Sequence, residues 1–215
     1  MIAEVKRKSP SRGALSPGLS AADRAESYVA GGAAALSVLT EESEFGGSLT
    51  DLAEVRTRVG VPLLRKDFHV HESQVWEARI AGASAVLLIA RALEPALLEF
   101  LCGATIDAGL EPLIEVRSAK ELDLAIHLRA PLIGINARNL ETLVIDATVV
   151  AELLPSVPRD RVAVAESGIQ GVDDVTRVAR QGADAVLVGS MLSLAPDGAD
   201  AVRGLTGMAR HGRAS

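Results

Sequence analysis

The sequence predicts a single α/β domain folded as a (β/α)8 TIM barrel, and three observations lead to that prediction. Eight short aliphatic runs recur along the 215 residues, each with the length of a buried strand. Segments with helical periodicity and recognisable ends lie between many of them. The spacing leaves room for a crossover helix between strands, as a parallel sheet requires. A doubly wound sheet is the alternative, but it usually has fewer strands and a Gly-rich loop after the first, which is not found after Lys6.

The predicted strands are rich in Val, Ile, Leu and Ala, and Gly, Pro or charged residues bound them. They are residues 2–6, 35–39, 62–66, 85–89, 112–116, 132–136, 162–166 and 185–189. Helices are predicted over 20–30, 72–81, 95–108, 118–127 and 172–181, most of them followed by a glycine that stops the helix. We expect one barrel domain over residues 1–210 and a frayed tail over 211–215.

Composition excludes several classes of protein. The chain has 22 basic and 28 acidic residues and a formal charge of -6, which argues against a general nucleic-acid binder. A small anionic ligand could still be held by a few cations in one cleft. Cys102 is the single cysteine, so a disulfide framework and a cysteine zinc site are excluded. With no apolar run of membrane-spanning length and no secretory signal, a cytoplasmic protein that binds neither nucleic acid nor membrane is expected.

Charged and polar residues stand at the ends of several predicted strands. In a barrel, active sites lie at the C-terminal strand ends. Because buried charges are costly unless they are paired, two lysines and three carboxylates there predict an acid–base site. A structural network of Lys–Glu pairs closing the barrel is the alternative. The candidate residues are Glu4, Lys6, Lys66, Glu115, Asn136 and Glu166.

The segments after the seventh and eighth predicted strands suggest a phosphate site. They contain Ser167-Gly168 and Gly189-Ser190, and the equivalent loops of many barrels hold phosphate through backbone N–H groups. Glycine lets the backbone approach an anion closely. Each dipeptide alone is an ordinary turn, but their joint placement favours phosphate binding.

Two histidines two residues apart, His69 and His71, follow the third predicted strand and could hold a divalent ion. A working site needs further ligands at other strand ends, and those ends offer Lys6, Asn136 and Ser190 instead. We therefore expect solvated loop histidines and no metal site.

Read in order, the strand-end segments resemble the indole-3-glycerol phosphate synthases of tryptophan biosynthesis. The resemblance implies a barrel that converts 1-(2-carboxyphenylamino)-1-deoxyribulose 5-phosphate into indole-3-glycerol phosphate, carbon dioxide and water, without a cofactor. The matching segments are IAEVKRKSPS (2–11), LTE (39–41), FGGS (45–48), LRKDF (64–68), PLIEV (112–116), GINARNL (134–140), AESGI (165–169) and VGS (188–190).

The resemblance also implies roles for the candidate residues. Lys66 would be a general acid, made acidic enough by burial and its neighbours, and Glu115 its acid–base partner. Lys6 would contact the substrate carboxylate or act as a second acid. Glu4, Asn136 and Glu166 would orient these groups and bind the ribulose chain. The substrate-binding set would be Ser9, Gly168, Gly189 and Ser190 for the phosphate, Phe45 and Phe68 for the anthranilate ring, and Arg138 and Ser167.

The chain departs from the family pattern at its N-terminus, where only Met1-Ile2-Ala3 precedes Glu4. Family members usually carry a preceding segment that covers the barrel mouth and the aromatic end of the substrate. We therefore expect weaker substrate binding, and a partner or a second copy covering the open mouth. A non-catalytic barrel that binds phosphorylated ligands is the alternative function. A phosphoribosylanthranilate isomerase is disfavoured, because it would rely on a Cys/Asp pair.

Overall fold

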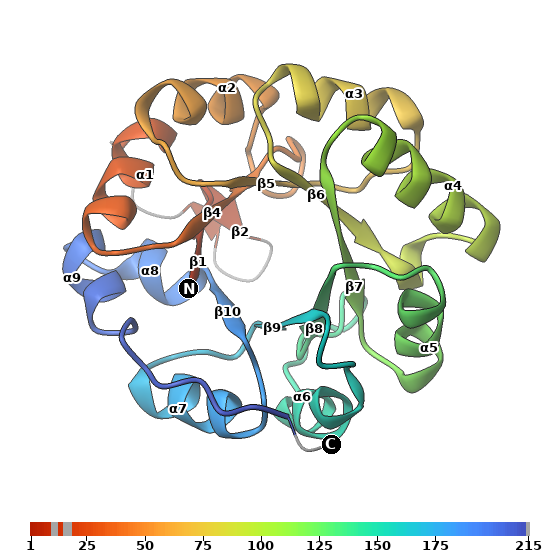
Figure 1. Ribbon diagram of the computed structural model, residues 1–215. Helices are drawn as coiled ribbons and strands as arrows, with labels where there is room; N and C mark the ends of the chain where they lie inside the picture. The colour runs from red at the N-terminus through yellow and green to blue at the C-terminus, as the bar shows by residue number, and fades with distance from the viewer. Residues whose placement is uncertain (10–12, 15–18, 214–215) are drawn as a thin grey trace.

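A computed structural model describes residues 1–9, 13–14 and 19–213 of the chain. Eight parallel strands close into a barrel, in the order β1, β10, β9, β8, β7, β6, β5 and β4, and helices surround it (Figure 1). The predicted TIM barrel is confirmed. The strands are β1 (Ile2–Val5), β4 (Ala35–Leu39), β5 (Leu63–Lys66), β6 (Ala85–Ile89), β7 (Glu111–Val116), β8 (Leu132–Asn136), β9 (Val162–Glu166) and β10 (Ala185–Val188).

The helices follow the strands in alternation. They are α1 (Ala21–Ala30), α2 (Leu49–Arg58), α3 (Glu72–Ile80), α4 (Pro95–Asp107), α5 (Ala119–His127), α6 (Ala147–Leu153), α7 (Val172–Arg180), α8 (Ser190–Leu194) and α9 (Gly198–Arg203), with 3-10 turns η1 (Ala90–Ala92) and η2 (Leu154–Ser156). A short antiparallel pair, β2 (Lys8–Ser9) and β3 (Gly13–Ala14), follows β1.

The five helices predicted from glycine stops and caps are confirmed as α1, α3, α4, α5 and α7. Helices α2, α6, α8 and α9 were not among the predicted helices. Helix α2 ends at Val59, in extended backbone, without a glycine at its C-cap. Across the part of the chain that the structure describes, no helix has both the length and the apolar character needed to cross a bilayer.

The lower part of the barrel lumen is aliphatic. Alternate side chains of each strand point inward, so a polar residue and the aliphatic one two positions before it share a face. The aliphatic layer contains Leu64, Leu87, Ile89, Leu113, Val164 and Leu187. Lys66 and Glu166 follow Leu64 and Val164 by two positions, and the polar residues therefore form a layer above the aliphatic one.

The strand pairing shows that these polar residues lie at or near the C-terminal ends of their strands. Leu39 pairs with Lys66, and Ile89 pairs with Glu115. Asn136 pairs with Glu166. Because all eight strands are parallel, the C-terminal ends meet at the same mouth of the barrel, where the candidate residues were predicted to lie.

The C-terminal residues include one buried arginine. Arg213 donates hydrogen bonds to the carbonyl oxygens of Gly182 at 2.8 Å, Pro158 at 3.0 Å and Arg161 at 2.7 Å. It also pairs with Asp184 at 2.7 Å. Residues 214–215 of the tail predicted over 211–215 lie outside the described residues.

We expect Arg213→Ala to lower the free energy of unfolding by about 3 kcal/mol, because it removes a buried ion pair with Asp184 and leaves three carbonyl oxygens without their donor. Arg210→Ala is the matched control, since Arg210 pairs with the same Asp184 from a side chain that is 73% exposed. Urea denaturation compares the two variants. Equal losses of unfolding free energy in the two variants would contradict a larger contribution from the buried Arg213.

Candidate active site

The C-terminal ends of the strands surround a cavity of about 520 Å³. All six residues predicted to be catalytic line it: Glu4, Lys6, Lys66, Glu115, Asn136 and Glu166. The lining also includes Phe45, Phe68, Arg138, Ser167, Gly168, Gly189 and Ser190, which were predicted to bind substrate. Ser9 lies in β2, and its side chain falls outside the described part of the structure. One cavity thus brings together residues from strands along the whole chain.

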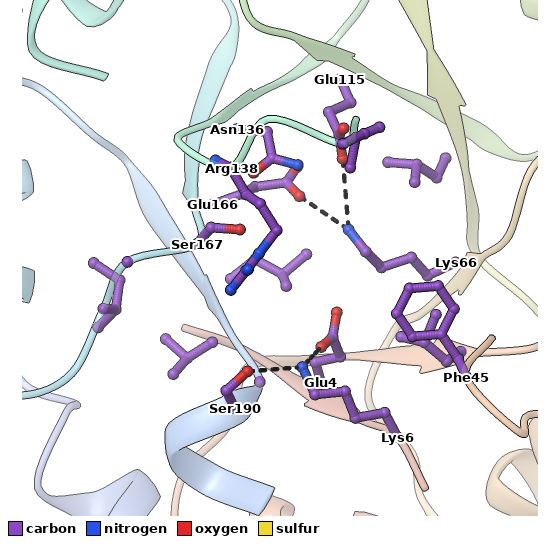
Figure 2. A pocket seen from close by; sticks show the side chains of 18 of the residues that line it. Glu4, Lys6, Phe45, Lys66, Glu115, Asn136, Arg138, Glu166, Ser167 and Ser190 are labelled. Carbon is purple, nitrogen blue, oxygen red and sulfur yellow. Dashed lines mark hydrogen bonds and ion pairs between the residues drawn. The ribbon is translucent and has the colours of Figure 1, made fainter. Parts of the chain in front are cut away.

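Lys66 is held between two carboxylates. Its Nζ atom lies 3.1 Å from Glu166 Oε2 and 3.6 Å from Glu115 Oε2 (Figure 2). The two glutamates come from β9 and β7 and are almost fully buried. Burial by itself lowers the pKa of Lys66, but Glu166, Glu115 and Glu4 outweigh it, and the net effect raises the pKa above its ordinary value.

The direction of this pKa shift corrects one expectation. A lysine made more acidic by burial and its neighbours was predicted, but in the unliganded site the surrounding carboxylates stabilise the charged ammonium more than burial penalises it. Lys66 is therefore a cation in the open site. It can still protonate a group that is more basic than itself, such as an alkoxide that forms during a reaction.

A second ion pair lies across the cavity. Lys6 Nζ is 2.7 Å from Glu4 Oε1 and donates a hydrogen bond to Ser190 Oγ at 3.1 Å (Figure 2). Burial raises the pKa of Glu4, but Lys6 and Lys66 outweigh it, so the net pKa lies below its ordinary value. Glu4 is therefore an anion, and this pair connects β1 to the start of α8.

Glu166 is a buried carboxyl group with a raised pKa. Burial, with Glu115 and Glu4 nearby, raises its pKa to about 7 despite the opposing effect of Lys66. Its Oε2 atom pairs with Lys66, whereas Oε1 is buried and has no hydrogen-bond partner among the described residues. A carboxyl group with such a pKa can exchange a proton near neutral pH.

Asn136 and Arg138 form the wall at the end of β8. The side-chain oxygen of Asn136 accepts a hydrogen bond from the backbone N–H of Arg138 at 2.9 Å. The Arg138 guanidinium donates to the carbonyl oxygen of Leu143 at 3.0 Å. Asn136 thus fixes the turn that follows the strand, and Arg138 adds a positive charge to the cavity wall.

The turn after β9 has an unusual backbone. Ser167 and Gly168 both lie in the left-handed region, with φ of 65° and 77°. A residue with a side chain is uncommon there, and such strain is often found at functional sites. Two successive left-handed residues bend the chain sharply directly after Glu166, so the backbone of this turn lines the cavity.

Gly189 has a steric role that the sequence did not reveal. A Cβ atom at this position would lie 2.1 Å from Glu4 Oε1 and 2.8 Å from Lys6 Nζ. The residue was predicted as a phosphate contact. In the structure, its lack of a side chain also makes room for the Glu4–Lys6 ion pair.

Sequence reasoning missed two supporting groups. Glu41 lines the cavity and accepts hydrogen bonds from the backbone N–H groups of Glu44 at 2.7 Å and Phe45 at 3.1 Å, which orders the turn that carries Phe45. Arg65 lies behind Lys66 and donates to Thr40 Oγ1 at 3.0 Å and Asp67 Oδ2 at 3.1 Å. The period-two alternation of β5 was the available signal, since Arg65 must face away from the lumen if Lys66 faces it.

The expectation of two solvated histidines is wrong for His69. This residue is buried, and its Nδ1 atom lies 2.7 Å from the carbonyl oxygen of Leu87. Burial and the nearby Arg65 lower its pKa to about 4. His71 caps the N-terminus of α3 by accepting from the backbone N–H of Ser73. Over residues 1–9, 13–14 and 19–213, no three His, Cys, Asp or Glu side chains are grouped to hold a metal ion.

The fold and the site together define a class of protein: a (β/α)8 barrel whose mouth holds a buried lysine–carboxylate cluster. A family model described as indole-3-glycerol phosphate synthase matches residues 1–205. The chain is 53% identical to the indole-3-glycerol phosphate synthase of Nocardioides sp. over 208 residues, covering 97% of this chain and 80% of that protein. It is 49% identical to indole-3-glycerol phosphate synthase 1 of Streptomyces coelicolor over 211 residues, covering 98% and 78%. The chain belongs to the indole-3-glycerol phosphate synthase family.

Similar solved structures support the fold alone. The 3-hexulose-6-phosphate synthase of Salmonella typhimurium aligns with a TM-score of 0.75 at 15% identity, covering 95% of each chain. The thiamine phosphate pyrophosphorylase of Pyrococcus furiosus aligns with a TM-score of 0.70 at 19% identity, covering 95% of this chain and 91% of that one. Both comparisons agree with the closed barrel.

Glu166 should make the protein less stable at alkaline pH. Its pKa is raised from 4.5 to about 7 in the folded state, so between these values the folded protein retains a proton that the unfolded chain releases. Stability therefore falls over this range and levels off above it. We expect Glu166→Gln to remove this part of the pH dependence. Thermal unfolding between pH 5 and pH 9 measures this pH dependence. The control is Glu141→Gln in an exposed ion pair, and an unchanged profile for Glu166→Gln would refute the assignment.

Proposed function

We infer that the chain converts 1-(2-carboxyphenylamino)-1-deoxyribulose 5-phosphate into indole-3-glycerol phosphate, carbon dioxide and water. The observation that carries this inference is the position of Lys66, between Glu115 and Glu166 at the mouth of a barrel from this family. The reaction needs a proton donor at a ketone oxygen and a second group that takes protons. The cluster supplies both kinds of group within one cavity.

Ring closure is the step that requires Lys66. The aromatic carbon that bears the carboxylate attacks the ketone carbon, a carbon–carbon bond forms, and the carbonyl electron pair moves to oxygen. The developing alkoxide is more basic than an ammonium group, so Lys66 can donate a proton even with a raised pKa. Its positive charge also stabilises the oxygen as negative charge develops.

Two steps then complete the product. Loss of the carboxylate as carbon dioxide leaves its bonding electrons in the ring system, which neutralises the positive charge created by ring closure. Departure of the new hydroxyl group as water needs an acid at oxygen and a base for the proton lost from the ring. Glu166, with a pKa of about 7, is suited to exchange protons here, and Glu115 and Lys6 are the other candidates.

The cavity also supports an orientation for the substrate. The backbone of Gly168, Gly189 and Ser190 would hold the phosphate, since the loops after the last two strands do so in many barrels. Phe45 and Phe68, which also line the cavity, would flank the anthranilate ring. Ser167 and Arg138 would bind polar groups between these two ends.

The mouth of the cavity has an apolar rim. Its exposed side chains include Phe68, Leu140, Ile145 and Leu194, which also line the cavity. We propose that a further apolar surface, from a second copy or a partner, covers this rim when substrate is bound, because closure excludes water from the reacting groups. The cytoplasmic location that the composition favours stays a prediction.

Lys66→Met should lower the rate of ring closure by about 10²- to 10⁴-fold, the usual contribution of a positioned acid. Indole fluorescence after mixing with the carboxyphenylamino-deoxyribulose phosphate measures the rate. Lys120→Met, at an exposed position on α5, is the matched control. Circular dichroism verifies that both variants fold. Turnover within about threefold of the parent protein would refute the role of Lys66.

Phe45→Ala should weaken binding of the full substrate about tenfold, because the ring loses apolar contact area worth about 25 cal/mol per Å². Binding of a bare sugar phosphate should not change, since it has no ring to contact Phe45. Calorimetry with the two ligands measures both effects. Equal weakening of both would place the aromatic end of the substrate elsewhere.

A further inference from the structure

Gly134 occupies a lumen position where a side chain has no space. It lies in β8 between Leu132 and Asn136 on the inward face of the strand. A Cβ atom at Gly134 would lie 2.0 Å from Glu166 Oε1 and 3.1 Å from Glu166 Cδ. It would also lie 2.9 Å from Leu113 Cδ2. The first distance is far below any non-bonded contact, so Glu166 could not keep its present position.

The backbone of Gly134 does not explain why glycine stands there. Its φ lies outside the left-handed region, unlike those of the turn glycines, so any residue could adopt this conformation. Glycine within a strand also costs stability, and it often marks a site where another group approaches closely. Here the approaching group is a carboxylate.

Glu166 has little freedom to move within the lumen. The residue is 1% exposed, and its Oε2 atom is committed to Lys66 at 3.1 Å. Leu113 and Val164 fill the lumen layer below it. A displaced carboxyl group would therefore move toward the open cavity, and its present contact with Lys66 would change.

We propose that Gly134 is a positioning residue for Glu166: the missing side chain lets the carboxylate lie against β8 and reach Lys66. The proposal deepens the proposed function and rests on it, because it assigns Gly134 an effect on turnover through Glu166. It also makes a structural claim about the location of the Glu166 carboxyl group, which can be tested without turnover.

Gly134→Ala should lower kcat about 10²-fold, the cost of displacing a catalytic group by about 1 Å. KM should change less than about threefold, because the contacts proposed for the phosphate and the ring are untouched. Gly103→Ala is the matched control: Gly103 lies in α4 with open space around it, and this variant should keep the parent activity.

A double-mutant cycle separates a clash with Glu166 from a general packing defect. In a Glu166→Ala background the carboxyl group is gone, so adding Gly134→Ala should change kcat by less than about threefold. An equal loss in both backgrounds would overturn the proposal. So would recovery of activity by Leu113→Val in the Gly134→Ala protein, since Leu113 would then be the group that clashes.

Whether the variants fold is a further test of the proposal. If Gly134→Ala does not give folded protein, the Gly134→Ala/Glu166→Ala protein should fold with the melting temperature of Glu166→Ala alone. Failure of the double variant to fold would overturn the proposal, because the clash would then not involve Glu166.

A readout independent of activity is the titration of Glu166 by carbon-13 NMR, its signal assigned by its loss in Glu166→Gln. The charged groups that face this carboxyl are Lys66, Glu115 and Glu4, and none of them is changed by Gly134→Ala. A displaced carboxyl group should titrate at least about half a pH unit away from the parent value. An unchanged midpoint would overturn the proposal, whereas inactive parent protein with a shifted midpoint would refute only the proposed function.

Discussion

The interaction on which the site depends is the pairing of buried Lys66 with Glu115 and Glu166. Charges removed from water are costly, and a buried carboxylate without a partner would take up a proton instead. The mouth of the barrel holds three such carboxylates, Glu4 included, against two lysines. The surplus negative charge explains why the pKa of Lys66 is raised and why that of Glu166 reaches about 7. The excess of carboxylates over lysines therefore keeps Lys66 charged and lets the neighbouring Glu166 exchange a proton near neutral pH.

The geometry of the lumen makes this pairing possible. Long charged side chains from opposite sides of a barrel can meet only where intervening positions are small. Gly134 and Gly189 are two such positions, and a Cβ atom at either would fall within 2.1 Å of a carboxylate oxygen of Glu166 or Glu4. The aliphatic layer beneath keeps water away from the lower side of the cluster. The two glycines thus leave space for the charged side chains, and the aliphatic residues beneath exclude water from them.

The sequence predicted the barrel and the strand-end residues of the cavity because both follow from periodicity, whereas Phe45, Phe68 and Arg138 were predicted from the family resemblance alone. Alternation along β5 puts Lys66 on the same face as Leu64, and the C-terminal ends of parallel strands must meet. Other features depend on distances between segments far apart in the chain. The direction of the pKa shift of Lys66 depends on how close three carboxylates from other strands come, and the burial of His69 depends on its contact with Leu87. The role of Gly134 could not be predicted from the sequence, because it depends on the position of Glu166 on another strand.

A second network outside the lumen stabilises the strand that carries Lys66. Arg65 points away from the cavity and binds Asp67, and Thr40 at the end of β4 donates to the same carboxylate at 2.5 Å. The residues on both sides of Lys66 are therefore held to the neighbouring strand, while Lys66 itself extends inward. The proposed role of Lys66 requires its position to be held to within about 1 Å, so a rigid backbone on both sides of it matters as much as the carboxylates in front of it. Because side chains alternate along β5, Lys66 faces the cavity, whereas Arg65 faces the other way and helps to fix the backbone that carries Lys66.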